Sequence, residues 1–497
     1  MILLSTTTDK KETVSSIINR EYRLKELVTV SSETPAGADM LVSNVITLMP
    51  DWNNLQPPVL FPPVTFNEDS LLGLIYAKLG NFEKAYQLLF SYPMLLNLAG
   101  LLNRLQYGIE IGKSHIDELK NQHYFFLHNR AIACHYGFVQ PPCEFVTVQN
   151  DYAEAISNAT DTNFKAFTEK HYALLLLDAG LLNDAETLLY KSLETTHPQN
   201  VEIDLKNTLC NVWMKQLVVP YNAGLLKKLK ATLWEVLKFY EKNNKNTEMA
   251  LVLTDAAHIA TVSHSFSEAM GYINRAISIF EEQKLEELLA QAHLNKANLL
   301  QTWAQNGNPQ FYRTAVKAYQ DALRTFTKEN APDIFAEIQH QLGKVYAEIP
   351  DEIKKKGVWA AVSVSSFNEA LNYYNKVDSP YEFALICNSY GNAYTKYPLS
   401  LHTDNFDKAL AWYREALDIR TAGKYPLERV LTLSNYLEAS WFAGNKSAFD
   451  EERYTDMVEK AKEILQLSDD PAIRKSATEH MKNLNDIKLQ TATGSNN

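Results

Sequence analysis

The second half of this chain repeats one pattern of residues at nearly constant steps, and this repetition constrains its fold most strongly. The segments PDIFAEIQHQLGKVY, PYEFALICNSYGNAY and PLERVLTLSNYLEAS begin 48 and 46 residues apart, at Pro332, Pro380 and Pro426. A small or apolar residue falls eleven positions later in each segment, at Gly343, Gly391 and Leu437. Proline suits the first turn of a helix, where its missing N–H has no intrahelical partner to lose. Each segment is therefore predicted to be the first helix of a repeated unit.

A second helical stripe follows each of these opening segments. The segment EELLAQAHLNKANLL, which starts at Glu286, extends the series backward without its proline. The second stripes place small, aromatic and apolar residues at i, i+4 and i+7, in the sets Ala315, Tyr319 and Ala322; Ala370, Tyr374 and Val377; and Ala409, Tyr413 and Ala416. This spacing puts three side chains on one face of a helix. The small residue allows two helices to approach closely and the aromatic ring fills the groove beside it.

The two stripes together resemble the tetratricopeptide repeat. The first helix of that repeat carries Leu-Gly-x-x-Tyr, and it is matched by Leu342, Gly343 and Tyr346 and again by Tyr390, Gly391 and Tyr394. The second helix is matched by Phe406, Ala409, Tyr413 and Ala416. The usual period is about 34 residues, so these units carry longer connections, such as EIPDEIKKKGVWAAVSVSS. The resemblance implies an all-α fold, an α-solenoid of stacked antiparallel helix pairs wound into a right-handed superhelix.

Fainter copies of the pattern in the first half suggest how the chain is divided. LLGLIYAKLGNFEKAYQLL matches through Leu72, Gly73, Tyr76, Gly80, Phe82 and Ala85. We expect an N-terminal cap or irregular segment (1–67), degenerate repeats (68–245), well-marked extended repeats (246–466), a C-terminal capping helix (467–490) and a disordered tail (491–497). The prolines of MPDWNNLQPPVLFPPVTF forbid a continuous helix there. That stretch is either a cap or linker, or a peptide arm that docks on a partner or folds back into the groove.

Composition and charge exclude several classes of partner. Only 17 Gly and 18 Pro in 497 residues favour long helices over many tight turns. The 48 basic and 59 acidic residues give a net charge of −11, which predicts no nucleic-acid partner. No apolar run approaches the roughly 20 residues that span a bilayer and the N-terminus does not read as a signal peptide, so we expect no membrane partner and a cytoplasmic location. The four cysteines, which lack CxxC spacing, are expected to be reduced and buried: Cys134, Cys143, Cys210 and Cys387.

The sequence contains no arrangement of residues typical of an enzyme. It has no Gly-rich phosphate loop, HExxH or GxSxG motif. The densest group of potential metal ligands is HYFFLHNRAIACHYG, with His123, His128, Cys134 and His135. A zinc site would need histidines at i, i+4 or a closed Cys/His set, so we interpret this segment as a packed, aromatic-rich helix pair. We expect no catalytic residue, no metal and no cofactor.

A function is most readily placed on the concave surface that the first helices of such repeats line. The residues one past the landmark and three before it are predicted to face this groove, and they are mostly polar. The candidate partner-binding residues are His258, Asn298, His340, Lys344, Asn388, Asn392 and Glu438. An Asn side chain can donate to and accept from a peptide unit, and Lys supplies a point charge for a carboxylate. The alternative is that these residues are merely solvated; in either case they should contribute little to packing.

We therefore predict a non-enzymatic scaffold or adaptor that binds a protein or an extended peptide in the groove. A second hypothesis is a regulatory subunit whose long inserts gate the response to a peptide or small ligand. The extended repeats are similar to bacterial arrays that often precede caspase-like (CHAT) peptidase domains, and this resemblance names one possible effector. The sequence leaves open the partner's identity, the face that binds it and the oligomeric state.

Overall fold

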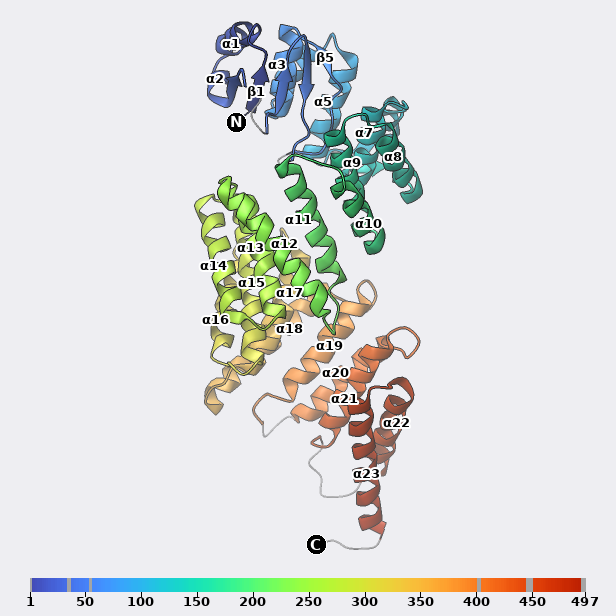
Figure 1. Ribbon diagram of the computed structural model, residues 1–497. Helices are drawn as coiled ribbons and strands as arrows, with labels where there is room; N and C mark the ends of the chain where they lie inside the picture. Colours follow the sequence, from blue (N-terminus) through green and yellow to red (C-terminus); the bar gives the residue numbers. More distant parts are fainter. Residues whose placement is uncertain (1, 34–36, 53–55, 400–403, 444–449, 493–497) are drawn as a thin grey trace. The chain divides into compact units, whose positions relative to one another are not determined.

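The computed structural model describes residues 2–33, 37–52, 56–399, 404–443 and 450–492 (Figure 1). The chain divides into two compact units, Met1–Asn243 and Asn244–Asn497. In the second unit each helix packs on the next one along the chain, and in the first unit most of the longer helices do the same. The predicted all-α solenoid of stacked, tetratricopeptide-like helix pairs is confirmed, with its main exception close to the N-terminus and a short two-stranded pair later in the first unit.

The main exception is a five-stranded sheet within residues 1–67, for which the sequence predicts an irregular cap. Its strands are β1 (Ile2–Thr6), β2 (Val28–Ser31), β3 (Met40–Val42), β4 (Val45–Leu48) and β5 (Val64–Thr65). The order is β2-β1-β3-β4-β5, with β1 parallel to β2 and β3 and antiparallel pairing beyond β3. Helices α1 (Lys11–Arg20) and α2 (Leu24–Leu27) connect β1 to β2. An irregular segment is thus the wrong description, because strands of two to five residues are too short for their periodicity to be recognised.

This sheet shares one core with the first helices of the first unit. Leu4, Met40 and Ile46 of the sheet are fully buried in the same cluster as Leu71 and Leu98. Helix α3 begins where the sequence predicts the repeats to begin, because Asn67 caps it: its side chain accepts from the backbone N–H of Ser70 (2.9 Å), whose Oγ accepts from the N–H of Asn67 (3.2 Å). A reciprocal pair of this kind satisfies N–H groups that the first turn leaves without partners.

The remainder of the first unit is a run of helices packed pairwise. They are α3 (Glu68–Lys78), α4 (Phe82–Leu89), α5 (Pro93–Gln106), α6 (Lys113–Glu118), α7 (Tyr124–Tyr136), α8 (Phe145–Asn158), α9 (Thr162–Asp178), α10 (Leu182–Leu193), α11 (Gln199–Gln216) and α12 (Ala223–Lys242). Two short strands pair in parallel within this run of helices: β6 (Ile111–Gly112), between α5 and α6, and β7 (Val139–Gln140), between α7 and α8.

A disulfide joins the end of α7 to the segment that precedes α8. Cys134 and Cys143 are bonded, with their Cα atoms 5.7 Å apart, whereas Cys210 and Cys387 are buried free thiols. The expectation that all four cysteines are reduced is therefore wrong for this pair. The nine-residue separation matches no motif, and it is the turn between α7 and α8 that brings the two sulfur atoms together.

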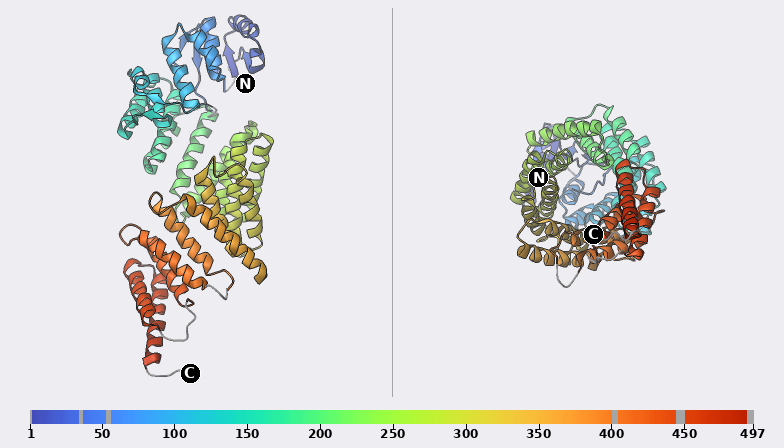
Figure 2. Two further views of the ribbon diagram at one scale, coloured as in Figure 1. Left: turned by 180° about the vertical axis from the view of Figure 1, so that it is seen from behind. Right: turned by 90° about the horizontal axis from the view of Figure 1, so that it is seen from below.

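The second unit contains the well-marked repeats (Figures 1 and 2). Its helices are α13 (Asn246–Val262), α14 (Phe266–Glu282), α15 (Glu286–Gln305), α16 (Phe311–Ala322), α17 (Pro332–Glu348), α18 (Ile353–Tyr373), α19 (Pro380–Tyr394), α20 (Asn405–Ile419), α21 (Pro426–Ser440), α22 (Glu451–Leu467) and α23 (Pro471–Ala492). The three repeat prolines each open a helix, as predicted. Helix α23 covers the predicted capping segment from Pro471 onward and includes the first two residues of the predicted disordered tail, whose other residues lie outside the described part of the chain.

The landmark glycines explain why the pattern repeats. A Cβ atom on Gly391 would lie 2.4 Å from the ring of Tyr413, and one on Gly343 would lie 2.8 Å from the ring of Phe367. In the first unit, the same atom on Gly73 would lie 2.6 Å from Leu89. Because glycine has no Cβ atom, each of these positions leaves room for a side chain of the second helix to pack directly against the backbone of the first helix.

Two details of the pair α17 and α18 differ from the prediction. The sequence places Tyr374 and Val377 on the packed face, but α18 ends at Tyr373 and Val377 is 86% exposed. The fully buried Phe367 packs against the glycine instead. The predicted long connection is mostly helix, since α18 starts at Ile353, and it adds turns to the second helix where the sequence suggests a loop that could act as a gate.

Candidate functional site

Two neighbouring cavities lie along the first helices of the second unit. The smaller, about 160 Å³, is bounded by the C-terminal end of α15 and by α17 and α19. The larger, about 470 Å³, is bounded by α19, α20 and the end of α21. Asn392 and Lys396 line both, so the two form one continuous surface. We call them the lysine cavity and the phenylalanine cavity, after Lys344 in the first and Phe406 and Phe442 in the second.

The lysine cavity is lined mainly by hydrogen-bond donors. Lys344 and Lys396 supply ammonium groups, Ser389 a hydroxyl and Asn392 an amide. Lys396 is paired with Glu348, the one carboxylate among the described residues that line this cavity. Lys344 donates to the side-chain oxygen of Gln341 at 2.9 Å. Burial, and secondarily the charge of Lys396, lower the pKa of Lys344, because both disfavour its ammonium form.

The phenylalanine cavity combines aromatic faces with one carboxylate. The rings of Phe406 and Phe442 are stacked with centroids 5.2 Å apart, and Phe442 is 63% exposed. Tyr413 and Glu438 also line the cavity. Burial, and secondarily the charge of Glu438, raise the pKa of Tyr413, so its hydroxyl stays protonated. An exposed phenyl face beside a pocket of this size is suited to an aromatic or large apolar group.

The structure places the seven candidate residues in three kinds of surroundings. Lys344, Asn392 and Glu438 line the cavities. Asn388 accepts a hydrogen bond from the side chain of Asn435 (3.2 Å), and His258 is exposed on α13. His340 is only 5% exposed, and burial lowers its pKa to about 3, so it is a neutral core residue. Asn298 is exposed on α15 and lines neither cavity.

Two of the candidate asparagines also hold their own repeat together. The hydroxyl of the buried Tyr319 lies 2.6 Å from Oδ1 of Asn298, and the hydroxyl of Tyr413 donates to Oδ1 of Asn392 at 2.7 Å. The expectation that groove-facing residues contribute little to packing is therefore wrong for these two. Because Oδ1 of Asn392 is engaged, the amide nitrogen with its two N–H groups is the part that remains for a ligand.

Several residues of this surface were not among the candidates. Ser389 and Asn435 lie two positions before the repeat landmarks, and Lys396 and Phe442 lie five positions after them. Residues two before and five after the landmark are three and four positions away from the residue one past it, so all three lie on the same helix face. Leu385 and Leu431 continue the same face four residues earlier and are 38% and 56% exposed. A strict count of helical positions would have included all of them.

In the first unit, the histidine and cysteine cluster does not form a site. His128 contacts Thr168 Oγ1 (2.9 Å) and the carbonyl oxygen of Pro58 (2.9 Å), and burial lowers its pKa to about 4. His135 contacts Tyr152 and Asp178, and Cys134 is bonded to Cys143. His123 is exposed at the start of α7. Among the residues that the structure describes, no group of three or more His, Cys, Asp or Glu side chains is arranged to hold a metal ion.

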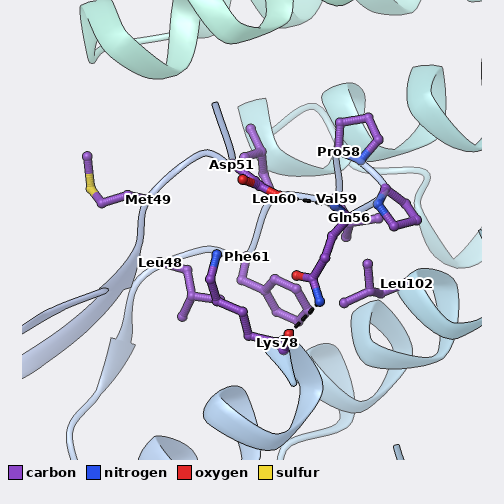
Figure 3. Close-up of a pocket in the computed structure, with 11 residues that line it drawn as sticks. Leu48, Met49, Asp51, Gln56, Pro58, Val59, Leu60, Phe61, Lys78 and Leu102 are labelled. Atoms are coloured by element: carbon purple, nitrogen blue, oxygen red, sulfur yellow. Dashed lines mark hydrogen bonds between the residues drawn. The ribbon is translucent and has the colours of Figure 1, made fainter. Parts of the chain in front are cut away.

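A further cavity lies beside the sheet of the first unit (Figure 3). Leu48, Phe61 and Leu102 line it, and the side chain of Gln56 closes one side by donating to the carbonyl oxygen of Lys78. Its volume of about 20 Å³ is roughly the space of one water molecule. We therefore do not assign a ligand to it.

Comparison with known proteins finds similarity to this chain among solved structures. No family model matches it, and no curated protein matches it. Among solved structures it resembles a Rap protein complexed with competence and sporulation factor, at 12% identity and a TM-score of 0.43 over 80% of this chain and 98% of that one. It also resembles a signal transduction ATPase with numerous domains (STAND) from Pyrococcus horikoshii that has a tetratricopeptide repeat sensor, at 12% identity and a TM-score of 0.49, over 98% and 78%.

A human IFIT1 dimer with PPP-AAAA is similar at 13% identity and a TM-score of 0.38, over 81% of this chain and 83% of that one. Within the described part of the chain, no helix is both long and apolar enough to cross a membrane.

Proposed function

We propose that this protein is a non-enzymatic scaffold or adaptor that binds an extended peptide segment of a partner protein along the first helices of its second unit. The observation that carries the proposal is the pair of adjoining cavities, which share Asn392 and Lys396. A donor-rich cavity beside an aromatic one provides successive sites for successive side chains of one peptide. A compact small molecule would use only one of them.

The chemistry of this surface supports binding rather than catalysis. A general base on it would need a pKa near neutrality. His340 has a pKa of about 3 and is buried, and Glu348 is paired with Lys396. The other polar and aromatic side chains that line the cavities are ammonium, amide, hydroxyl and phenyl groups and the carboxylate of Glu438, and these groups hold a ligand through hydrogen bonds, charge and ring contacts.

The phenylalanine cavity favours a second candidate function. Its volume of about 470 Å³ lies within the range of small-ligand sites, roughly 300 to 1,000 Å³. A ligand held there would contact α19, α20 and α21 together and bias how these helices stack. The protein would then be a ligand-responsive regulatory subunit, and a bacterial caspase-like (CHAT) peptidase is the effector that the sequence resemblance suggests. Thermal stabilisation by a small molecule, without any partner protein, would favour this candidate.

The experiment that tests the scaffold proposal uses a groove-filling variant. Ser389 lines the lysine cavity, so Ser389→Trp should block it, whereas Ser278 is exposed on the second helix α14 and Ser278→Trp is the matched control. The full chain is selected against a display library of unstructured peptides, and the affinities of enriched peptides are measured by fluorescence anisotropy. We expect binding to weaken at least about tenfold in Ser389→Trp and to be unchanged in Ser278→Trp. Peptides that bind both variants equally would place the binding surface elsewhere.

A further inference from the structure

The lysine cavity holds a positive charge for which the described residues supply no paired carboxylate. Among the described residues, the carboxylate of the cavity, Glu348, is paired with Lys396, and the hydrogen-bond partner of Lys344 is the neutral Gln341. Lys344 is half-buried and has a second ammonium group, Lys396, on the same cavity. A buried charge without a counter-charge is costly. An anionic ligand would therefore be stabilised at this place.

The number of uncompensated charges indicates which anion fits. Three ionic groups line the cavity, and the pair of Lys396 with Glu348 leaves a net charge of one from Lys344. A carboxylate carries a single charge, whereas a phosphate group carries nearly two at pH 7. The neutral donors beside Lys344 are the Asn392 amide and the Ser389 hydroxyl, which can complete the hydrogen bonds of two carboxylate oxygens. The charge count thus favours a carboxylate over a phosphate.

The surroundings of the cavity indicate that the carboxylate belongs to a side chain within a peptide rather than to a chain end. The phenylalanine cavity adjoins on one side through Asn392 and Lys396. On the other side, the polar face of α15 continues with Asn298, which is exposed. A peptide can therefore extend in both directions from Lys344. A terminal carboxylate would leave one of these directions unused.

The spacing of the two cavities sets the spacing of the two side chains. First helices of adjacent repeats lie roughly 8–10 Å apart. An extended peptide advances about 3.3 Å per residue, so two or three residues cover that distance. Resting on the proposed peptide-binding function, we infer that the partner segment carries an Asp or Glu side chain, held by Lys344 and Asn392, two or three positions from an aromatic residue that stacks on Phe442.

The experiment pairs changes in the peptide with changes in the full-length protein. A Glu-x-Phe peptide is compared with its Gln-x-Phe, Glu-x-Ala and phosphoserine-x-Phe forms by fluorescence anisotropy. The protein variants are Lys344→Gln and, as a matched control, Lys317→Gln on the exposed face of the second helix α16. We expect Glu to Gln in the peptide to weaken binding about tenfold or more on the native chain and to have almost no effect on Lys344→Gln. Lys317→Gln should behave like the native chain.

Four outcomes distinguish a failure of the inference from a failure of the scaffold proposal. If the peptide is blocked by Ser389→Trp but is indifferent to its own Glu to Gln change, the groove binds peptides without this anion site. If phosphoserine binds more tightly than Glu, the ligand is a phosphate. If the Gln-x-Phe penalty persists in Lys344→Gln, another residue holds the carboxylate. If no peptide is blocked by Ser389→Trp, the proposed function itself has failed. Thermal melts of both Lys variants verify that they are folded.

Discussion

At the scale of the residue, a few side chains serve both the fold and the candidate site. Asn392 lines both cavities, and its Oδ1 accepts from the nearly fully buried Tyr413. Removing it would leave the tyrosine hydroxyl unpaired, which costs roughly 1–3 kcal/mol for a buried polar group. A change in binding after substitution of Asn392 would therefore mix two effects. Lys344 and Ser389 are better positions for testing the site. Lys344 donates to the half-buried side chain of Gln341, and within the described part of the chain Ser389 makes no hydrogen bond to a buried tyrosine.

Among the described glycines of the second unit, Gly391 is the one at which an added Cβ atom would come closest to another side chain. We expect Gly391→Ala to destabilise the protein by roughly 1–3 kcal/mol, because the new Cβ atom would lie 2.4 Å from the Tyr413 ring. Gly271 on α14 has no atom within 4 Å of the same position, so Gly271→Ala should be stabilising by about 0.5–1 kcal/mol through its helix propensity. Urea denaturation followed by circular dichroism measures both. Equal midpoints for the two variants would show that the repeat register is wrong.

At the scale of the element, a proline-containing strand-like segment is held against α7 in the way a bound peptide would be. Asn129 Oδ1 accepts from the N–H of Leu60 at 2.8 Å, and its Nδ2 donates to the C=O of the same residue at 2.7 Å. His128 contacts the carbonyl oxygen of Pro58. Leu60 and Phe61 are 3% and 4% exposed. These contacts make the stretch part of the core of the first unit, where it connects the sheet to the helices.

The two hydrogen bonds of Asn129 lead to a prediction about this segment. Asn129→Ala would leave the buried N–H and C=O of Leu60 without partners, so we expect a loss of at least about 2 kcal/mol. Hydrogen exchange of the Leu60 amide should become faster by at least about tenfold. Asn150 is exposed on α8, and Asn150→Ala should change neither quantity. An unchanged exchange rate at Leu60 in Asn129→Ala would mean that the segment is held by its apolar side chains alone.

At the scale of the whole molecule, the two units differ in how they are stabilised. The first unit has a mixed sheet, a buried ion pair of Lys170 with Asp204 and a disulfide. The second unit relies on repeated helix pairs and contains the two cavities. The disulfide also bears on the compartment, because disulfides persist in oxidising environments and are rare in the cytosol. It opposes the cytoplasmic location that the sequence predicts.

The number of free thiols decides between these two environments. Protein from its native source, denatured without reductant and alkylated, should carry two modified cysteines, Cys210 and Cys387. After reduction, all four cysteines should be modified. Mass spectrometry distinguishes the two states, and peptide mapping assigns the sites. Four modified cysteines without reductant would favour the reducing cytoplasm and show that Cys134 and Cys143 are thiols in the cell.

The sequence by itself determined the repeated helix pairs of the second unit. The helix starts at Pro332, Pro380 and Pro426 were predicted at the correct residues, and the packing role of Gly343 and Gly391 followed from their positions. These features are local, because helical hydrogen bonds and side-chain faces repeat every three to four residues. A periodic pattern is therefore enough to reveal them.

The tertiary structure decided the features that depend on residues far apart in the chain. The sheet pairs β1 with strands that begin at Val28 and Met40, and the disulfide depends on the turn after α7. The hydrogen bonds of Asn392 and Leu60, and the two cavities, likewise join different helices or segments. Periodicity along one helix carries no information about which side chain lies opposite. The sequence could thus name the face on which Lys344 lies. Only the tertiary structure showed that its hydrogen-bond partner among the described residues is the neutral Gln341, while Glu348 pairs with Lys396.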